Sequence, residues 1–158
     1  MPIFTIQVLL ALVTFGLLAR WYVAPRLASL PREVALQPLL AVHSIRYVGL
    51  VFLAPTVVRP SLSASFAIPA GVGTAIAGVL ALAAIGALRA RSPIAIPLVW
   101  VFSVEGIGDF INAFLQAGLH GAVNDLGAAY YVPIVIVPAA LVTHAMIVWL
   151  LVKRRLPW

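Results

Sequence analysis

Five long apolar runs, separated by short stretches with arginine, proline and glycine, constrain the fold of this chain more than any other feature. A helix rises ~1.5 Å per residue, so about 20 apolar residues cross the ~30 Å hydrocarbon core of a bilayer. Backbone groups in lipid must bond within their own segment, which favours helices. The sequence therefore predicts an all-α integral membrane protein, a compact bundle of five transmembrane helices that forms a single domain over residues 1–158. The expected spans are 3–22, 36–58, 66–88, 94–119 and 130–152.

The composition excludes several other classes of protein. Hydrophobic residues make up 64% of the chain and charged residues 9%, whereas about a quarter of a soluble domain is charged. The chain has no cysteine, which excludes disulfides, thiolate metal sites and a cysteine nucleophile. The net charge is +6, but most of the basic residues lie beside the apolar runs and form no single patch. We therefore expect the lipid bilayer, and no nucleic acid, as a partner.

The distribution of basic residues predicts the orientation of the bundle. Five spans place the two termini on opposite sides of the membrane, and cytoplasmic loops carry an excess of Lys and Arg. Only Arg59 falls on one predicted side. On the other side lie Arg20, Arg26, Arg32, Arg89, Arg91, Lys153, Arg154 and Arg155. This predicts an N-terminus outside and a C-terminus in the cytoplasm, in a bacterial inner membrane.

Two features predict how the helices pack. The run 66–88 is rich in small residues, which let helix backbones approach closely in lipid. These residues are Gly71, Gly73, Gly78, Ala81, Ala83, Ala84 and Gly86. Pro138 lies inside the last run, where it removes a backbone hydrogen bond, so we expect a kink there.

Polar residues inside the runs indicate where a site lies. The ionisable ones are His43, Arg46, Glu105, Asp109 and His144. A lone charge at a helix centre costs roughly 2.5–3.5 kcal/mol, so these groups are expected to face one another. In the fourth span, residues 102, 105, 109, 112 and 116 recur at steps of three and four and make one stripe. That stripe is expected to face the bundle interior.

A count of depth from the cytoplasmic end of each span suggests the partners. Arg46 comes out ~15 Å deep and Glu105 ~18 Å deep, which predicts a buried ion pair between them. Asp109 then extends the polar track outwards and is the group expected to change its protonation. The predicted ligand or proton site consists of Arg46, Glu105, Asp109, Asn112, Gln7 and Tyr47. A role in fixing helix register alone is the competing interpretation of the ion pair.

The two histidines raise a second hypothesis. His43 and His144 come out at matching depths of ~10–12 Å, so their imidazoles are expected to meet if their helices touch. Two such histidines could ligate a b-type haem, since histidine is a common axial ligand, which would make the protein an electron carrier. Hydrogen-bonded core histidines without a cofactor are the alternative.

No catalytic motif accompanies these residues. The chain has no phosphate loop, no nucleophile elbow, no zinc pair and no dinucleotide fingerprint. We therefore favour a non-enzymatic membrane protein that binds a small polar or amphipathic ligand or relays protons. An accessory membrane subunit with a purely structural polar core is a further alternative. Five helices enclose little space, so a homo-oligomer or a larger complex is expected.

Overall fold

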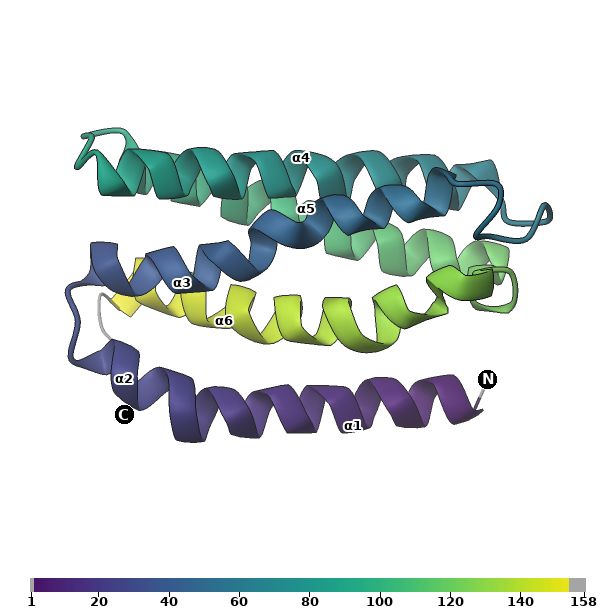
Figure 1. The fold of residues 1–158 in the computed structure, drawn as a ribbon, viewed down its shortest axis with the longest axis horizontal. Helices are drawn as coiled ribbons and strands as arrows, with labels where there is room; N and C mark the ends of the chain where they lie inside the picture. The colour runs from purple at the N-terminus through teal and green to yellow at the C-terminus, as the bar shows by residue number, and fades with distance from the viewer. Residues whose placement is uncertain (1, 154–158) are drawn as a thin grey trace.

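The computed structural model of the chain describes residues 2–153 and contains five antiparallel helical rods, with no strand among those residues (Figure 1). The first rod consists of α1 (Pro2–Leu18), the π-helical turn η1 (Ala19–Val23) and α2 (Ala24–Ala28). The second consists of α3 (Arg32–Ser44) and the 3₁₀ segment η2 (Ile45–Leu53). The third and fourth are α4 (Ala64–Arg89) and α5 (Ala95–His120).

Two short 3₁₀ turns, η3 (Ala122–Asn124) and η4 (Gly127–Tyr130), lead into the fifth rod. That rod consists of the π-helical turn η5 (Val132–Ile136) and α6 (Val137–Lys153). All five rods are long and apolar enough to cross a membrane. The expectation of an all-helical chain with five such segments is therefore confirmed.

The ends of the second rod differ from the predicted span 36–58. The helix begins at Arg32 and ends at Leu53, because Ala54 is extended and Pro55 follows it. A residue before proline is biased away from helical backbone. The helix is therefore one turn longer at its start than expected, and residues 54–63 form a loop.

Both π-helical turns come just before a proline. Proline has no N–H and its ring clashes with the carbonyl four residues earlier, so the regular helix bonding cannot continue through it. A wider π turn before the proline changes the bonding register. η1 precedes Pro25, and η5 precedes Pro138, so the irregularity predicted at Pro138 takes the form of a π turn.

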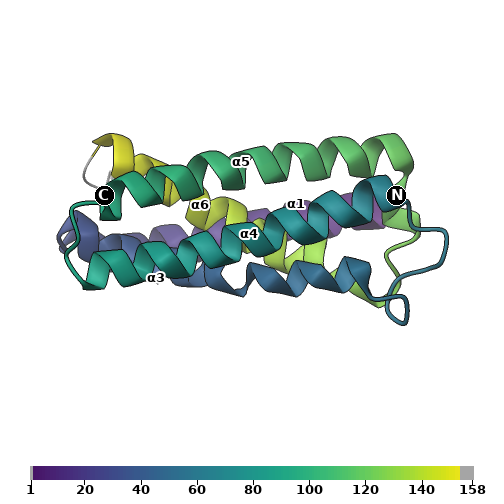
Figure 2. The ribbon, with the colours of Figure 1, turned by 90° about the horizontal axis from the view of Figure 1, so that it is seen from above.

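The helices pack around α4 and α6. α4 lies against α3 and η2 on one side and against α5 on another, as Figure 2 shows for α4 and α5. α6 lies against α3 and against α1. α1 is peripheral and largely exposed, and α5 and α6 touch over only a short part of their lengths. A groove between α5 and α6 is lined by side chains from both helices.

Glycines allow the second rod to approach α4 closely. A Cβ atom on Gly49 would clash with Thr74 Cγ2, and one on Gly78 would lie 3.3 Å from the Ser44 carbonyl oxygen. The small-residue packing predicted for α4 is found at Gly71, Gly78, Ala81 and Ala84, which are all buried. Ala83 and Gly86 are exposed instead.

The 3₁₀ geometry of η2 decides which side chains face inwards. A 3₁₀ helix has three residues per turn, so every third residue shares a face. His43, Arg46, Gly49 and Phe52 are buried at that spacing, whereas Tyr47 is 59% exposed. Tyr47, which the sequence assigns to the same site as Arg46, therefore lies on the outer face, because at three residues per turn it does not share the face of Arg46.

The charges divide between the two ends of the bundle. One end, which we call the basic end, carries the α2–α3 turn, the α4–α5 turn and the end of α6 (Figure 1). Its basic residues include Arg26, Arg32, Arg89, Arg91 and Lys153. At the opposite end, the loop with Arg59 bonds to the loop with Asp125 through the Arg59 N–H and the Asp125 carbonyl, 3.0 Å apart. Arg154 and Arg155, which also support the predicted orientation, lie outside the described residues.

Candidate functional site

A buried ion pair joins the second and fourth rods. Arg46 Nη2 donates to Asp109 Oδ2 at 2.5 Å, and the two side chains are 2% and 6% exposed. Arg46 Nε donates to Thr74 Oγ1 on α4 at 3.2 Å. The guanidinium carbon lies 4.3 Å from the centre of the Phe110 ring, at a distance typical of a cation–π contact. Arg46 therefore links three rods within an apolar core.

The predicted ion pair between Arg46 and Glu105 was wrong, because Arg46 pairs with Asp109 instead. The reason is the earlier start of α3. The second and fourth rods both begin at the basic end, at Arg32 and Ala95. Arg46 and Asp109 follow these first residues by the same number of positions, so they lie at the same depth in the bundle. A count from residue 36 places Arg46 one helical turn too near the basic end.

Glu105 lies one turn from Asp109 and lines a different space. It borders an open groove of about 420 Å³ between α4 and α5, together with Asp109 and Asn112. Glu105 interacts electrostatically with Arg46 but forms no ion pair with any residue in 2–153, and its Oε2 is buried without a hydrogen-bond partner. Glu105 and Asn112 thus lie along the α4–α5 seam, whereas Asp109 of the same stripe also reaches inwards to Arg46.

The structure brings the two histidines into contact. His43 and His144 are 0% and 4% exposed, and their ring centres lie 5.1 Å apart at 81°. Phe102 packs against both rings, at 4.9 and 5.2 Å between centres. The imidazoles therefore belong to the same core as Arg46.

The hydrogen bond of His144 determines the tautomer of its ring. His144 Nε2 lies 3.2 Å from the Ser103 carbonyl oxygen, which only accepts, so Nε2 is the donor. His43 Nε2 lies 3.1 Å from Thr143 Oγ1, and the Thr143 hydroxyl donates to the Ala139 carbonyl at 2.9 Å. In His144, Nδ1 is left as an acceptor, and the Nδ1 atoms of both rings are buried without a partner.

This arrangement does not fit a haem held by both histidines. A haem would have to lie between the two imidazoles with one nitrogen of each directed at the iron. Here the rings contact each other edge to face, and the Nε2 atoms point to Thr143 and Ser103. Among residues 2–153 there is also no group of three His, Asp or Glu side chains that could hold a metal ion.

Gly106 packs closely against two of the side chains that carry unpartnered nitrogens, Arg46 and His144. A Cβ atom on Gly106 would lie 3.1 Å from Arg46 Nη1, 3.4 Å from His144 Nδ1 and only 2.8 Å from His144 Cε1. Arg46 Nη1 and Ser103 Oγ are also buried without partners. Buried polar atoms are almost always hydrogen-bonded, so such a group of them needs an explanation. We call His43, Arg46, Ser103, Asp109 and His144 the central polar cluster.

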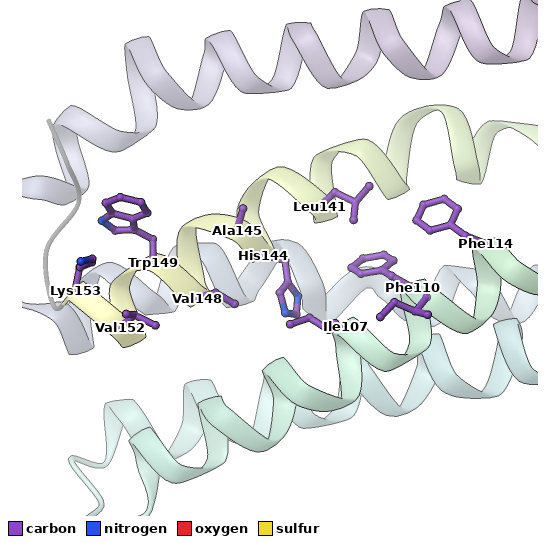
Figure 3. A pocket seen from close by; sticks show the side chains of 11 residues that line it. Ile107, Phe110, Phe114, Leu141, His144, Ala145, Val148, Trp149, Val152 and Lys153 are labelled. Carbon is purple, nitrogen blue, oxygen red and sulfur yellow. The ribbon is translucent and has the colours of Figure 1, made fainter.

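An apolar groove of about 590 Å³ runs between α5 and α6, and Figure 3 shows its lining. Ile107 and Phe110 from α5 face Leu141 and Val148 from α6, and His144 lies among them. Trp149 and Lys153 line the part of the groove nearest the basic end. The groove is open on one side, so it connects the outer surface with a member of the central polar cluster.

A second cavity of about 150 Å³ lies inside the bundle, towards the opposite end. Its walls are apolar except for Thr74 and Asp109. It shares Phe110, Phe114 and Leu141 with the groove. These three side chains therefore form the partition between the two spaces.

Two of the remaining predicted site residues lie elsewhere. Gln7 accepts a hydrogen bond from the Tyr130 hydroxyl at 2.6 Å and so ties α1 to η4. Tyr47 points outwards. Sequence reasoning missed Thr74, Ser103 and Thr143, although hydroxyl residues inside an apolar run are a usable signal, because they bond readily to polar groups on neighbouring helices.

Comparisons with known proteins place the chain in one family. No curated protein and no solved structure matches it. Residues 3–152 match the model of a family described as a domain of unknown function, DUF8737. Since the match extends over nearly the whole chain, the chain belongs to the DUF8737 family.

Proposed function

We propose that this chain is an integral membrane protein, with its N-terminus outside and its C-terminus in the cytoplasm of a bacterial inner membrane. The five apolar rods and the concentration of Arg and Lys at the basic end support this orientation. A reporter fused to the C-terminus and active only in the cytoplasm tests it. Activity of a reporter that works only outside the cytoplasm would contradict it.

Within the membrane, the protein binds a single-chain amphiphile that enters sideways from the bilayer. The α5–α6 groove carries this proposal, because its walls are apolar along their length and its one polar side chain in the middle, His144, belongs to the central polar cluster. Binding sites of small molecules commonly combine apolar walls with a few placed polar groups. The chain of the amphiphile lies along α5 and α6, and its head reaches His144.

The interior cavity extends this site. Phe110 separates the groove from the cavity and also covers the Arg46 guanidinium. A volume of about 150 Å³ accommodates a short apolar segment, since an engineered apolar cavity of this size binds benzene. Rotation of the Phe110 ring would join the two spaces into one path beside the ion pair.

Fluorescence of Trp149 tests the proposal directly, because this residue lines the groove. In a variant in which Trp21, Trp100 and Trp158 are replaced by phenylalanine, a dibrominated undecanol added to phosphatidylcholine nanodiscs is expected to quench Trp149 with a saturable dependence on concentration. Bromine quenches tryptophan only at close contact. The quenching is expected to be weaker when Ala145→Phe fills the groove.

Matched controls separate groove binding from simple partition into lipid. A variant that keeps only Trp100, which is 41% exposed on α5 and does not line the groove, should show unsaturable quenching. Val104→Phe, at a site that is 68% exposed and does not line the groove, should leave the quenching of Trp149 unchanged. Identical quenching curves for Trp149 and Trp100 would refute amphiphile binding and favour a structural role for the polar core.

A proton relay is the second candidate, and the contact between His43 and His144 favours it. Each ring offers an unpartnered Nδ1 near the Arg46–Asp109 pair. In liposomes that contain a pH-sensitive dye, a relay would give a proton flux that Asp109→Asn abolishes and Asn112→Ala spares. A flux equal to that of protein-free liposomes would exclude this candidate.

A further inference from the structure

We propose that the open groove between α4 and α5 docks a transmembrane helix of a partner protein, and that this helix carries one lysine or arginine halfway across the membrane. The basic side chain of the partner pairs with Glu105. This groove shares no lining residue with the α5–α6 groove. The inference therefore rests on the proposed membrane insertion but is independent of amphiphile binding.

Polar side chains of α5 line the α4–α5 groove, and two of them have no partner. Glu105, Asp109 and Asn112 follow one another at steps of four and three residues, so they lie along one face of the helix. Asp109 is paired with Arg46. The side chains of Glu105 and Asn112 form no hydrogen bond with any residue in 2–153, and Glu105 Oε2 is buried without a partner. The groove therefore offers a carboxylate and an amide to an incoming group.

The charges at this depth do not balance within the described spans. Arg46 attracts both carboxylates of α5, but its ion pair is with Asp109. Glu105 lies ~15 Å along α5 from Ala95, which is halfway across a hydrocarbon core of ~30 Å. Lipid tails supply no counter-charge there, and an unpaired carboxylate among them is costly. A cation brought by a partner would remove that cost.

The shape of the groove suits a helix. Gly73 of α4 and Gly108 of α5 both line it, and small residues let helix backbones approach closely in lipid. A Cβ atom on Gly108 would have nothing within 4 Å, so the space outside α5 is open at this residue. Ile68, Val72 and Ile76 follow one another at steps of four residues along α4 and are 55%, 44% and 47% exposed. They form a ridge that can pack into the groove of another helix.

Other occupants fit these observations less well. In a two-fold dimer, a second copy of this chain would place Glu105 against a like charge, and its Arg46, which is 2% exposed, could not reach the groove. A single-chain amine keeps its charged head near the headgroups, because a charge in the middle of the bilayer is costly. A spanning helix, in contrast, holds each of its side chains at a fixed depth.

Energy transfer between the protein and designed spanning peptides tests the inference. The chain has no cysteine, so Ser65→Cys, at an exposed site that does not line the groove, carries a single donor dye. The probes are leucine–alanine helices of about 20 residues with an acceptor dye and with lysine, leucine or glutamate at the centre. In phosphatidylcholine vesicles, the lysine peptide is expected to associate about tenfold more tightly than the leucine peptide. Equal affinities, or a preference for the glutamate peptide, would overturn the proposal.

Two substitutions then locate the docking site. Glu105→Gln is expected to bring the affinity ratio of lysine to leucine peptide close to one, and a ratio that survives this change would refute the role of Glu105. Gly108→Leu, which fills the groove, should weaken the association of both peptides. Gly118→Leu is the matched control, because it lies on the same helix, outside the groove, with nothing within 4 Å of an added Cβ. It should keep the affinities of the parent protein.

Three further readouts distinguish the alternatives. Energy transfer between two differently labelled copies of the protein, lost in Glu105→Gln, would assign the groove to a second copy and contradict the proposal. Displacement of the lysine peptide by an equal concentration of undecylamine would assign it to a lipid amine instead. Saturable quenching of Trp149 by the dibrominated undecanol should persist in Glu105→Gln. If this quenching persists while all peptides associate equally, the partner helix is refuted and the amphiphile site stands.

Discussion

Arg46 on η2 and Asp109 on α5 form an ion pair that is almost fully enclosed by apolar side chains. The pair is held in place by the Thr74 hydroxyl and by the Phe110 ring beneath the guanidinium. Removing one member of such a pair leaves the other charged and buried, which is more costly than the loss of the bond itself. The pair therefore joins the second and fourth rods inside the core.

Loss of the Asp109 carboxylate should lower the free energy of unfolding more than loss of the Glu105 carboxylate. Asp109→Asn is expected to lower the free energy of unfolding by about 3–5 kcal/mol, because it leaves Arg46 without a counter-charge. Glu105→Gln should cost less than about 1 kcal/mol, because Glu105 has no ion pair among residues 2–153. Titration of detergent-solubilised protein with sodium dodecyl sulfate measures both. Equal losses, or a larger loss for Glu105→Gln, would contradict the observed pairing.

The close approach of η2 to α4 at Gly49 leads to a second prediction, about stability. Gly49→Ala should destabilise the protein by about 1–3 kcal/mol, because the new Cβ atom clashes with Thr74 Cγ2. Thr74→Ser removes that methyl group and keeps the hydroxyl that accepts from Arg46. The double variant should therefore recover part of the loss in a double-mutant cycle. Gly16→Ala, where nothing lies within 4 Å, serves as the control and should not destabilise. Purely additive effects would show that the two residues are not in contact.

The bond between Tyr130 and Gln7 is expected to hold α1 on the bundle. α1 contacts α6 and η5 and is otherwise peripheral, and the Phe4 and Tyr130 rings also meet at 5.7 Å between centres. Tyr130→Phe should cost about 1 kcal/mol and speed hydrogen exchange in the nearby end of α1. Tyr131→Phe, at a site that is 68% exposed, should change neither. Unchanged exchange in α1 after Tyr130→Phe would argue against this tether.

The geometry of the two histidines leads to a prediction for the absorption spectrum. Because His43 and His144 contact each other edge to face, protein purified from cells supplied with ample haem should show no Soret band that depends on both residues. The absorption spectra of the parent protein and of His43→Ala measure this. A Soret band that disappears in His43→Ala would contradict the described arrangement.

The helical bundle was predictable from sequence because it depends on length and polarity alone. Apolar runs long enough to cross a bilayer and bounded by Arg and Pro are visible without a structure, and so is the need of a buried arginine for a carboxylate partner. The choice between Glu105 and Asp109 was not predictable. It depended on one helical turn at the start of α3, since charged Arg32 and Glu33 lie inside the helix rather than before it.

Other features depend on contacts between distant residues. The 3₁₀ segment η2, in which Tyr47 is exposed, contains Gly49, and Gly49 lies close to Thr74 on another helix. The pairing of Gln7 with Tyr130 depends on the path of residues 121–131 between α5 and η5. The α5–α6 groove arises from the distance between two helices that are far apart in the sequence. None of these distances can be read from periodicity.

The central claim is that a single-chain amphiphile lies in the α5–α6 groove with its head at His144 of the central polar cluster. An experimental structure of the protein with the dibrominated undecanol tests this most directly, because bromine atoms can be located by anomalous scattering. The account predicts bromine density in the groove near Trp149 or Phe114 and the head of the probe at His144. Bromine found only at other surfaces of the bundle, with the groove free of it, would contradict the account.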